Sequence, residues 1–172
     1  MSNLVIEKLY IFSTQNKTAK VVEFDSGKNI VTSSQVDGNN KGKSVILKSI
    51  YHTLGADCKF DPKWDEKEKT YILKTIVDDK IMYFYRHDRL FRIMDENEKI
   101  IFQTINRSRL AEYLEGIFNF AVRLPNKEDN KLEIVPPVYN YLLNYIDQDG
   151  MNCTNFSSFN NLTQYSNYKE NV

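Results

Sequence analysis

The sequence predicts an α/β domain in which a strand–turn–helix unit is joined to an antiparallel sheet. Residues 29–55 carry the first unit, because a β-branched apolar run precedes a polar turn and a helical apolar stripe. Residues 70–105 contain four short strand-like runs separated by acidic turns, which is the pattern of a β-meander. Residues 4–24 predict a hairpin ahead of both. The 172 residues match the length of one domain or a large part of one.

The composition excludes several classes of protein. A hydrophobic content of 41%, with 11 Tyr, 10 Phe and one Trp, is enough to build a core and argues against disorder. Lys plus Arg and Asp plus Glu both number 23, so no global positive field attracts nucleic acid. Cys58 and Cys153 lack metal-ligand spacing and predict free thiols in a reducing compartment. No apolar run approaches the length of about 18 residues that spans a membrane, so we expect a soluble cytoplasmic protein.

The strand–turn–helix unit has the pattern of a phosphate-binding turn. Ile30 to Thr32 predict a buried strand, and Asp37 to Lys41 predict the turn. A helix should then begin at Gly42-Lys43-Ser44 and end before Gly55, a typical glycine position after a helix. The residues expected on its buried face are Leu47, Ile50, Tyr51 and Leu54.

Gly42-Lys43-Ser44 at a strand-to-helix turn predicts a site for a nucleoside triphosphate. Amide groups at the start of a helix have no intrahelical partner and carry partial positive charge. Lys43 should reach the β- and γ-phosphates, and the Ser44 hydroxyl should hold Mg²⁺. Asp37 stands where the full motif has its first glycine, and a chance occurrence of the tripeptide is the alternative interpretation. The phosphate-cradling residues should be Asn39, Asn40, Lys41, Gly42, Lys43, Ser44 and Val45.

The remaining chain predicts a sheet followed by mainly helical and loop segments. Strands are expected at 4–12, 19–24, 70–77, 80–86, 89–94 and 99–105, with a surface loop at 56–69. Asn106 or Ser108 should cap a helix that runs to about Phe120. Its apolar residues are Leu110, Tyr113, Leu114, Ile117 and Phe118. Residues 124–137 predict a loop, and residues 138–146 fit either a helix or a strand.

With these elements in place, the chain resembles the N-terminal half of an ABC-type ATPase head of the SMC, RecN and SbcC kind. The resemblance rests on SSQVDGNNKGKSVILKSIYHTLGAD and PPVYNYLLNYIDQDG, which are similar to a bacterial group of such ATPases found in defence-type gene clusters. It implies a P-loop NTPase lobe with an antiparallel β-meander, and ATP and Mg²⁺ as cofactors. It also implies that Gln148 is the Q-loop glutamine, which would hold Mg²⁺ together with Ser44.

The resemblance also implies a division of the chain and a set of partners. Residues 1–55 would be hairpin, P-loop and helix, 70–105 the meander, 106–150 a helical segment with the Q-loop, and 151–172 a tail toward a missing helix or coiled coil. No LSGG-like signature or Walker B strand occurs in the sequence. The chain would therefore need the C-terminal half of the head, in the same or a separate chain, and a head-to-head dimer. ATP-driven engagement in DNA repair, DNA processing or anti-phage defence is the implied role, with this chain alone inactive as an ATPase.

Two rival functions remain open at this point. The first is a non-catalytic interaction module with a decayed P-loop, and the second is a standalone P-loop kinase or GTPase, which would need motifs that the sequence lacks. His52 and His87 are expected to be solvated, and Asp147 and Asp149 to lie in a polar exposed turn. One basic cluster predicts either a solvated face or a contact with the phosphate backbone of DNA. Its members are Arg86, Arg89, Arg92, Arg107 and Arg109.

Overall fold

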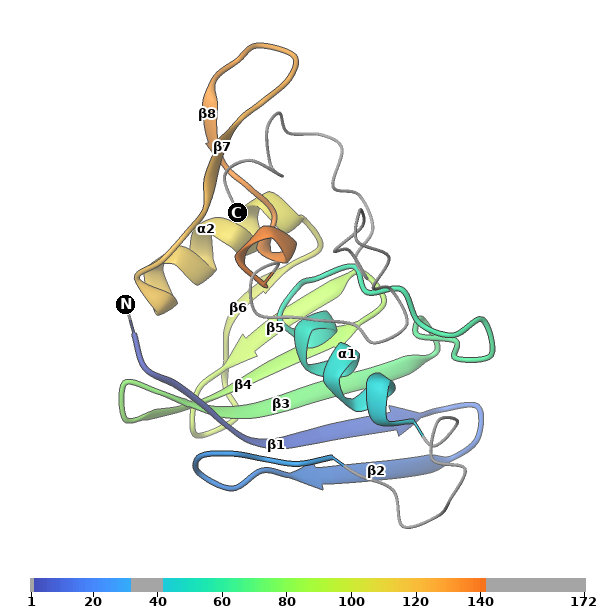
Figure 1. Cartoon of the computed structure of the whole chain (residues 1–172). Helices are drawn as coiled ribbons and strands as arrows, with labels where there is room; N and C mark the ends of the chain where they lie inside the picture. Colours follow the sequence, from blue (N-terminus) through green and yellow to red (C-terminus); the bar gives the residue numbers. More distant parts are fainter. Residues whose placement is uncertain (1, 32–41, 142–172) are drawn as a thin grey trace.

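The computed structural model of the chain describes residues 2–31 and 42–141. In them a six-stranded antiparallel sheet in the order β2-β1-β3-β4-β5-β6 is covered on one face by two α-helices (Figure 1). The strands are β1 (Leu4–Ser13), β2 (Thr18–Glu23), β3 (Lys69–Val77), β4 (Lys80–His87), β5 (Leu90–Met94) and β6 (Ile100–Thr104). All six predicted strands of this sheet are confirmed within one or two residues at each end. Neither helix in the described part of the chain is long and apolar enough to cross a membrane.

One strand joins the predicted hairpin and the predicted meander into a single sheet. Strand β1 pairs antiparallel with β2 on one side and with β3 on the other, although 45 or more residues separate β2 from β3 in sequence. The register carries one row of core residues across all six strands. That row runs through Val22, Leu9, Leu73, Phe84, Ile93 and Phe102.

The alternation of side chains separates the two faces of the sheet. In β3, Tyr71, Leu73, Thr75 and Val77 are buried, whereas the residues between them are partly exposed. The neighbouring row on the open face runs through Val21, Tyr10, Ile72, Tyr85, Arg92 and Gln103. Alternate residues of each strand therefore point toward the helices, and the residues between them lie on the open face of the sheet.

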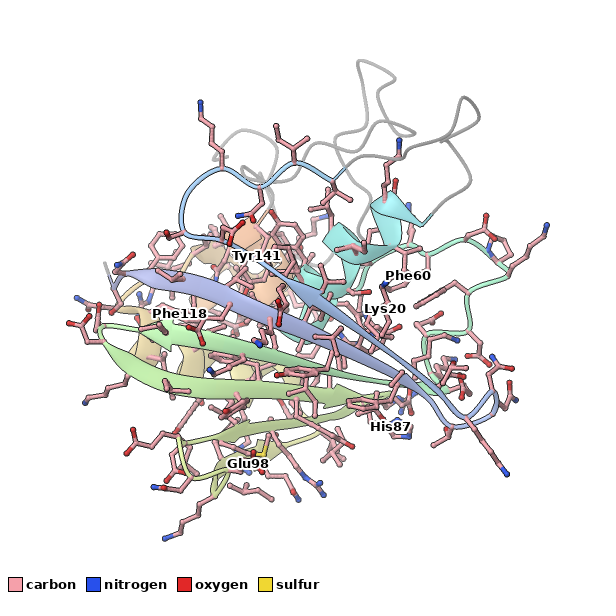
Figure 2. The ribbon with its side chains drawn as sticks, turned by 90° about the horizontal axis from the view of Figure 1, so that it is seen from below. Lys20, Phe60, His87, Glu98, Phe118 and Tyr141 are labelled. Carbon is pink, nitrogen blue, oxygen red and sulfur yellow. The ribbon has the colours of Figure 1, made fainter. Side chains whose placement is uncertain are left out.

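Helices α1 (Lys43–Thr53) and α2 (Arg107–Phe118) form the second layer. Ile50 and Leu54 pack with Leu110 and Leu114 against the core row of the sheet. Seen from below, α1 lies on one face of the sheet with Phe60 and Tyr141 beside it (Figure 2). The side-chain oxygen of Asn106 accepts hydrogen bonds from the amides of Ser108 and Arg109 at 2.8 and 3.2 Å, so Asn106 is the cap of α2.

A smaller core extends the domain beyond α2. It is formed by Ala56, Cys58, Leu124, Val135, Val138 and Tyr139. Residues 124–137, expected to be a loop, include a two-stranded hairpin of β7 (Arg123–Pro125) and β8 (Leu132–Ile134), which projects beyond α2 (Figure 1). A 3₁₀ helix, η2 (Pro137–Tyr141), follows. The prediction of a loop is wrong at β7 and β8. These strands have three residues each, too short to show a period, and three prolines in the segment favoured a loop.

Two expectations for the strand–turn–helix unit are also wrong. Of the strand predicted at Ile30 to Thr32, Thr32 lies outside the described residues. Ile30 and Val31 form no strand and Ile30 is 86% exposed, because the sheet ends at β2 and no described strand is available to pair with them. Leu47, placed on the buried face of α1, is 41% exposed. Ser49 and Thr53 are buried in its place, so small side chains rather than Leu47 face the sheet.

Candidate nucleotide-binding site

Helix α1 begins at Lys43, within the GKS motif where the sequence predicts the start of a helix. Gly42 precedes the helix in the left-handed conformation, with φ 76° and ψ 11°, which a glycine adopts without strain. Its carbonyl accepts the first helical hydrogen bond from the amide of Ile46 at 3.2 Å. Among the described residues no side-chain hydrogen bond caps this end of α1, and its first turn holds no acidic residue. The first amides of a helix have no intrahelical partner, and α1 itself carries no carboxylate that would repel an anion there.

The described part of the site consists of Gly42, Lys43, Ser44 and Val45. Lys43 and Ser44 are the first two residues of α1 and are partly exposed, as a lysine and a hydroxyl that meet a ligand should be. Asn39, Asn40, Lys41 and Asp37 lie outside the described residues, and so does Gln148. The proposed approach of Gln148 to Ser44 therefore stays a prediction. Residues 2–31 and 42–141 contain no cluster of three or more His, Cys, Asp or Glu side chains suited to a metal ion.

The carboxyl end of α1 is closed by its own backbone and by Gly55. The amide of Gly55 donates to the carbonyl of His52 at 3.1 Å, and the amide of Ala56 donates to that of Tyr51 at 2.9 Å. This pair of bonds is the Schellman motif, which requires a residue with positive φ, and Gly55 has φ 104°. The predicted role of Gly55 is confirmed.

Arg86 is not part of a surface patch, which corrects the DNA-binding prediction. It is 3% exposed and lies on the core face of β4, two residues after the buried Phe84. Nη1 of Arg86 donates to the carbonyls of His52 at 2.7 Å and Ala56 at 2.8 Å. Nη2 lies 3.2 Å from Oδ1 of Asp57. The guanidinium therefore donates hydrogen bonds to the carboxyl end of α1 and to the turn that follows it.

The other arginines of the predicted patch are also divided among different roles. Arg107 pairs with Oδ1 of Asp57 at 2.5 Å. Arg92 lies on the open face of the sheet, where it stacks over Tyr85 and donates to Gln103 at 2.8 Å. Arg89 in the β4–β5 turn and Arg109 in the first turn of α2 are exposed. Arg86 and Arg92 thus face opposite sides of the sheet, so the five arginines do not form one continuous surface.

Both histidines are less exposed than expected. His52 is 3% exposed, with its ring 5.0 Å from that of Tyr71 and 5.2 Å from that of Phe60. Burial, reinforced by the positive charge of Arg86, lowers the pKa of His52 to about 2, so its ring is neutral at physiological pH. His87 ends β4 rather than lying in a turn, and its Nδ1 is 3.1 Å from the hydroxyl of Thr70.

Asp57 is the residue that the sequence did not single out. It lies in the segment predicted to be a surface loop, yet it joins Arg86 of β4 to Arg107 of α2. The alternation of β4 held a usable signal, because Arg86 shares its parity with Phe84 and so belongs to the buried face. A buried arginine requires an anion or carbonyls nearby. The identity of those partners is visible only in the folded chain.

Comparison with known proteins finds relatives among the Lamassu proteins. The chain is 44% identical over 165 residues to Lamassu protein LmuB of a Bacillus cereus strain, and 28% identical over 147 residues to Lamassu protein LmuB of another Bacillus. No family model matches the chain, and no solved structure matches it. The first alignment covers 96% of this chain but 28% of that relative, and the second covers 85% and 25%. This chain is therefore homologous to about a quarter of the length of each LmuB protein.

Proposed function

We propose that this chain is the ATP–Mg²⁺-binding lobe of an SMC-like ABC ATPase with a role in anti-phage defence. The observation that carries the nucleotide assignment is the amino end of α1. There, a left-handed Gly42 leads directly into Lys43 and Ser44, with no acid in the first turn and no side-chain cap from the described residues. Homology to Lamassu LmuB supports the defence role. The chain corresponds to 28% of the first relative, which is consistent with one part of a larger protein.

The described residues fit a bound triphosphate. Lys43 would neutralise phosphate charge, and the amides of the first turn would donate hydrogen bonds to phosphate oxygens. The hydroxyl of Ser44 would hold Mg²⁺, whose preference for oxygen ligands it satisfies. Bound ATP–Mg²⁺ would supply the charge that a second head recognises. Gln148 would complete the metal shell, and the C-terminal half of the head would supply the signature and Walker B residues. DNA is the further proposed partner.

The geometry of Ile30 agrees with a lobe that requires a second half. Ile30, in the β-branched run that precedes the nucleotide turn, is 86% exposed in the described part of the chain. In the proposed head, Ile30 and Val31 would begin the P-loop strand and pair with strands of the C-terminal half. The rival interpretation, an interaction module with a decayed P-loop, predicts no affinity for ATP–Mg²⁺.

Calorimetric titration of the 172-residue chain with ATP–Mg²⁺ tests the nucleotide assignment. The wild type should bind, and Lys43→Ala should abolish binding while leaving the circular dichroism spectrum unchanged, because Lys43 is partly exposed. Lys59→Ala is the matched control, since it also removes one positive charge, from an exposed loop residue. A folded wild type without affinity, or equal affinity in Lys43→Ala, would contradict the assignment. In phage-challenged bacteria that carry the complete gene cluster, Lys43→Ala should remove protection and Lys59→Ala should not.

A further inference from the structure

Arg86 places a positive charge at the end of α1 opposite to Lys43. The last carbonyls of a helix have no intrahelical partner and carry partial negative charge. Arg86 satisfies two carbonyls there, those of His52 and Ala56. Its Nε also donates to the carbonyl of Asp88 at 3.1 Å, and its guanidinium lies 4.8 Å from the centre of the Phe91 ring. The guanidinium therefore contacts β5 and the β4–β5 turn on one side and the carboxyl end of α1 on the other.

Asp57 extends this contact to the second helix. Its Oδ1 pairs with Arg86 and with Arg107, the first residue of α2. The carbonyl of His52 also accepts the amide of Gly55, so the Schellman turn and Arg86 meet at one oxygen atom. The carboxyl end of α1, the sheet and α2 thus share one partly buried network of hydrogen bonds. By contrast, no side chain from residues 2–31 or 42–141 caps the amino end with a hydrogen bond.

We propose that Arg86 is a positioning residue for the phosphate-binding end of α1. This inference rests on the proposed function. Helix α1 has 11 residues and is therefore about 16 Å long, short enough to move as one rigid rod. Fixing its carboxyl end therefore also fixes the position and the rotation of Lys43 and Ser44, at the other end of the helix, relative to the sheet. Loss of Arg86 should therefore weaken phosphate binding, although Arg86 contacts no part of the nucleotide.

Arg86→Lys is the variant that tests this role. Lysine keeps the charge but lacks the planar guanidinium. Only the guanidinium can reach the carbonyls of His52, Ala56 and Asp88 and the carboxylate of Asp57 at the same time. Glu68→Gln is the matched control. Glu68 accepts hydrogen bonds from Gln15, Ser13 and Lys69 at the β1–β2 turn, so its loss destabilises the fold away from the contacts of Arg86.

Two quantities are measured. The first is the affinity of the 172-residue chain for ATP–Mg²⁺, under conditions where urea titration shows each variant fully folded. The second is the rate of amide hydrogen exchange at the first turn of α1. Arg86→Lys should bind roughly tenfold more weakly than the wild type, the scale of loss seen when a residue that orients a ligand is removed. Exchange at the amide of Ile46 should be faster in this variant. Glu68→Gln should keep wild-type affinity, because a loss of stability alone leaves a folded site intact.

The outcomes separate the positioning role of Arg86 from the nucleotide site itself. Wild-type affinity in folded Arg86→Lys overturns the positioning role and leaves the nucleotide site standing. A folded wild type without affinity overturns the proposed function and the positioning role with it. An equal loss in Glu68→Gln shows that affinity follows general stability and also overturns the role. If Arg86→Lys does not fold, Asp57→Asn replaces it, because it weakens the hold on Arg86 while leaving both carbonyl bonds, and unchanged affinity there overturns the role.

Discussion

Gly55 lies so close to Leu110 that a Cβ atom built on the glycine would stand 2.8 Å from Cδ2 of Leu110. The same atom would lie 3.0 Å from Cγ of Pro137. Gly55 therefore has two separate reasons to be a glycine: its φ of 104° and the close approach of α2 and η2. The turn that ends α1 is at the same time the place where the main core and the smaller core meet.

Gly55→Ala should destabilise the fold by about 2–4 kcal/mol, from backbone strain plus overpacking against Leu110 and Pro137. Gly27→Ala is the matched control, because Gly27 has nearly the same φ, 105°, with no atom within 4 Å of the added Cβ. It should cost roughly 1–2 kcal/mol, the backbone share alone. Urea denaturation measures both. Equal losses in the two variants would show that the close packing at Gly55 has no energetic weight.

Asn106→Ala should cost about 1 kcal/mol of unfolding free energy, because it removes the side chain that accepts the amides of Ser108 and Arg109. Ser108→Ala is the control, since the exposed Ser108 was the other residue that the sequence offered as the cap. It should change stability by less than about 0.5 kcal/mol. A larger loss in Ser108→Ala than in Asn106→Ala would place the start of α2 elsewhere.

His52 should make the folded state sensitive to acid above the range in which carboxylates titrate. Its pKa is about 2 in the folded chain and about 6.5 when unfolded, so the unfolded state binds more protons between these values. The free energy of unfolding should therefore fall as the pH drops below about 6.5, at a slope that approaches about 1.4 kcal/mol per pH unit.

His52→Phe should remove this slope between about pH 5 and 6.5, because phenylalanine keeps the aromatic contacts with Tyr71 and Phe60 but cannot be protonated. Denaturation series at several pH values in that window measure the difference. The same slope in the variant and the wild type would show that another group governs acid stability. Below about pH 4.5, Glu68 should add its own loss, because hydrogen bonds, first of all from the Gln15 amide, lower its pKa to about 2.

The 172-residue chain should hydrolyse ATP no faster than its Lys43→Ala variant. The sequence holds no Walker B glutamate to polarise water and no LSGG-like signature to complete a composite site. Phosphate release at saturating ATP–Mg²⁺ measures this. Turnover above the Lys43→Ala background would contradict the proposed half-head and favour a complete small NTPase.

Local patterns in the sequence determined where most elements lie. Alternation in residues 70–105 and the acidic turns between its runs located β3 to β6, because the side chains of a strand alternate between two faces whatever it pairs with. Gly42 and Gly55 marked the two ends of α1, because glycine adopts positive φ without steric strain wherever it lies in the fold. The GKS motif likewise identified the candidate site from neighbouring residues alone.

The tertiary structure decided which of these elements meet. Only the folded chain joins β1 to β3, buries His52 between Phe60 and Tyr71, and brings Asp57 to Arg86. Ile30 shows the same limit from the other side, because β propensity produces a strand only where a neighbouring strand supplies hydrogen bonds. Contacts between residues far apart in sequence depend on how whole faces fit together. No short stretch of the chain encodes that fit. Arginines that looked alike in the sequence therefore have different environments, since Arg86 is buried and Arg89 and Arg109 are exposed.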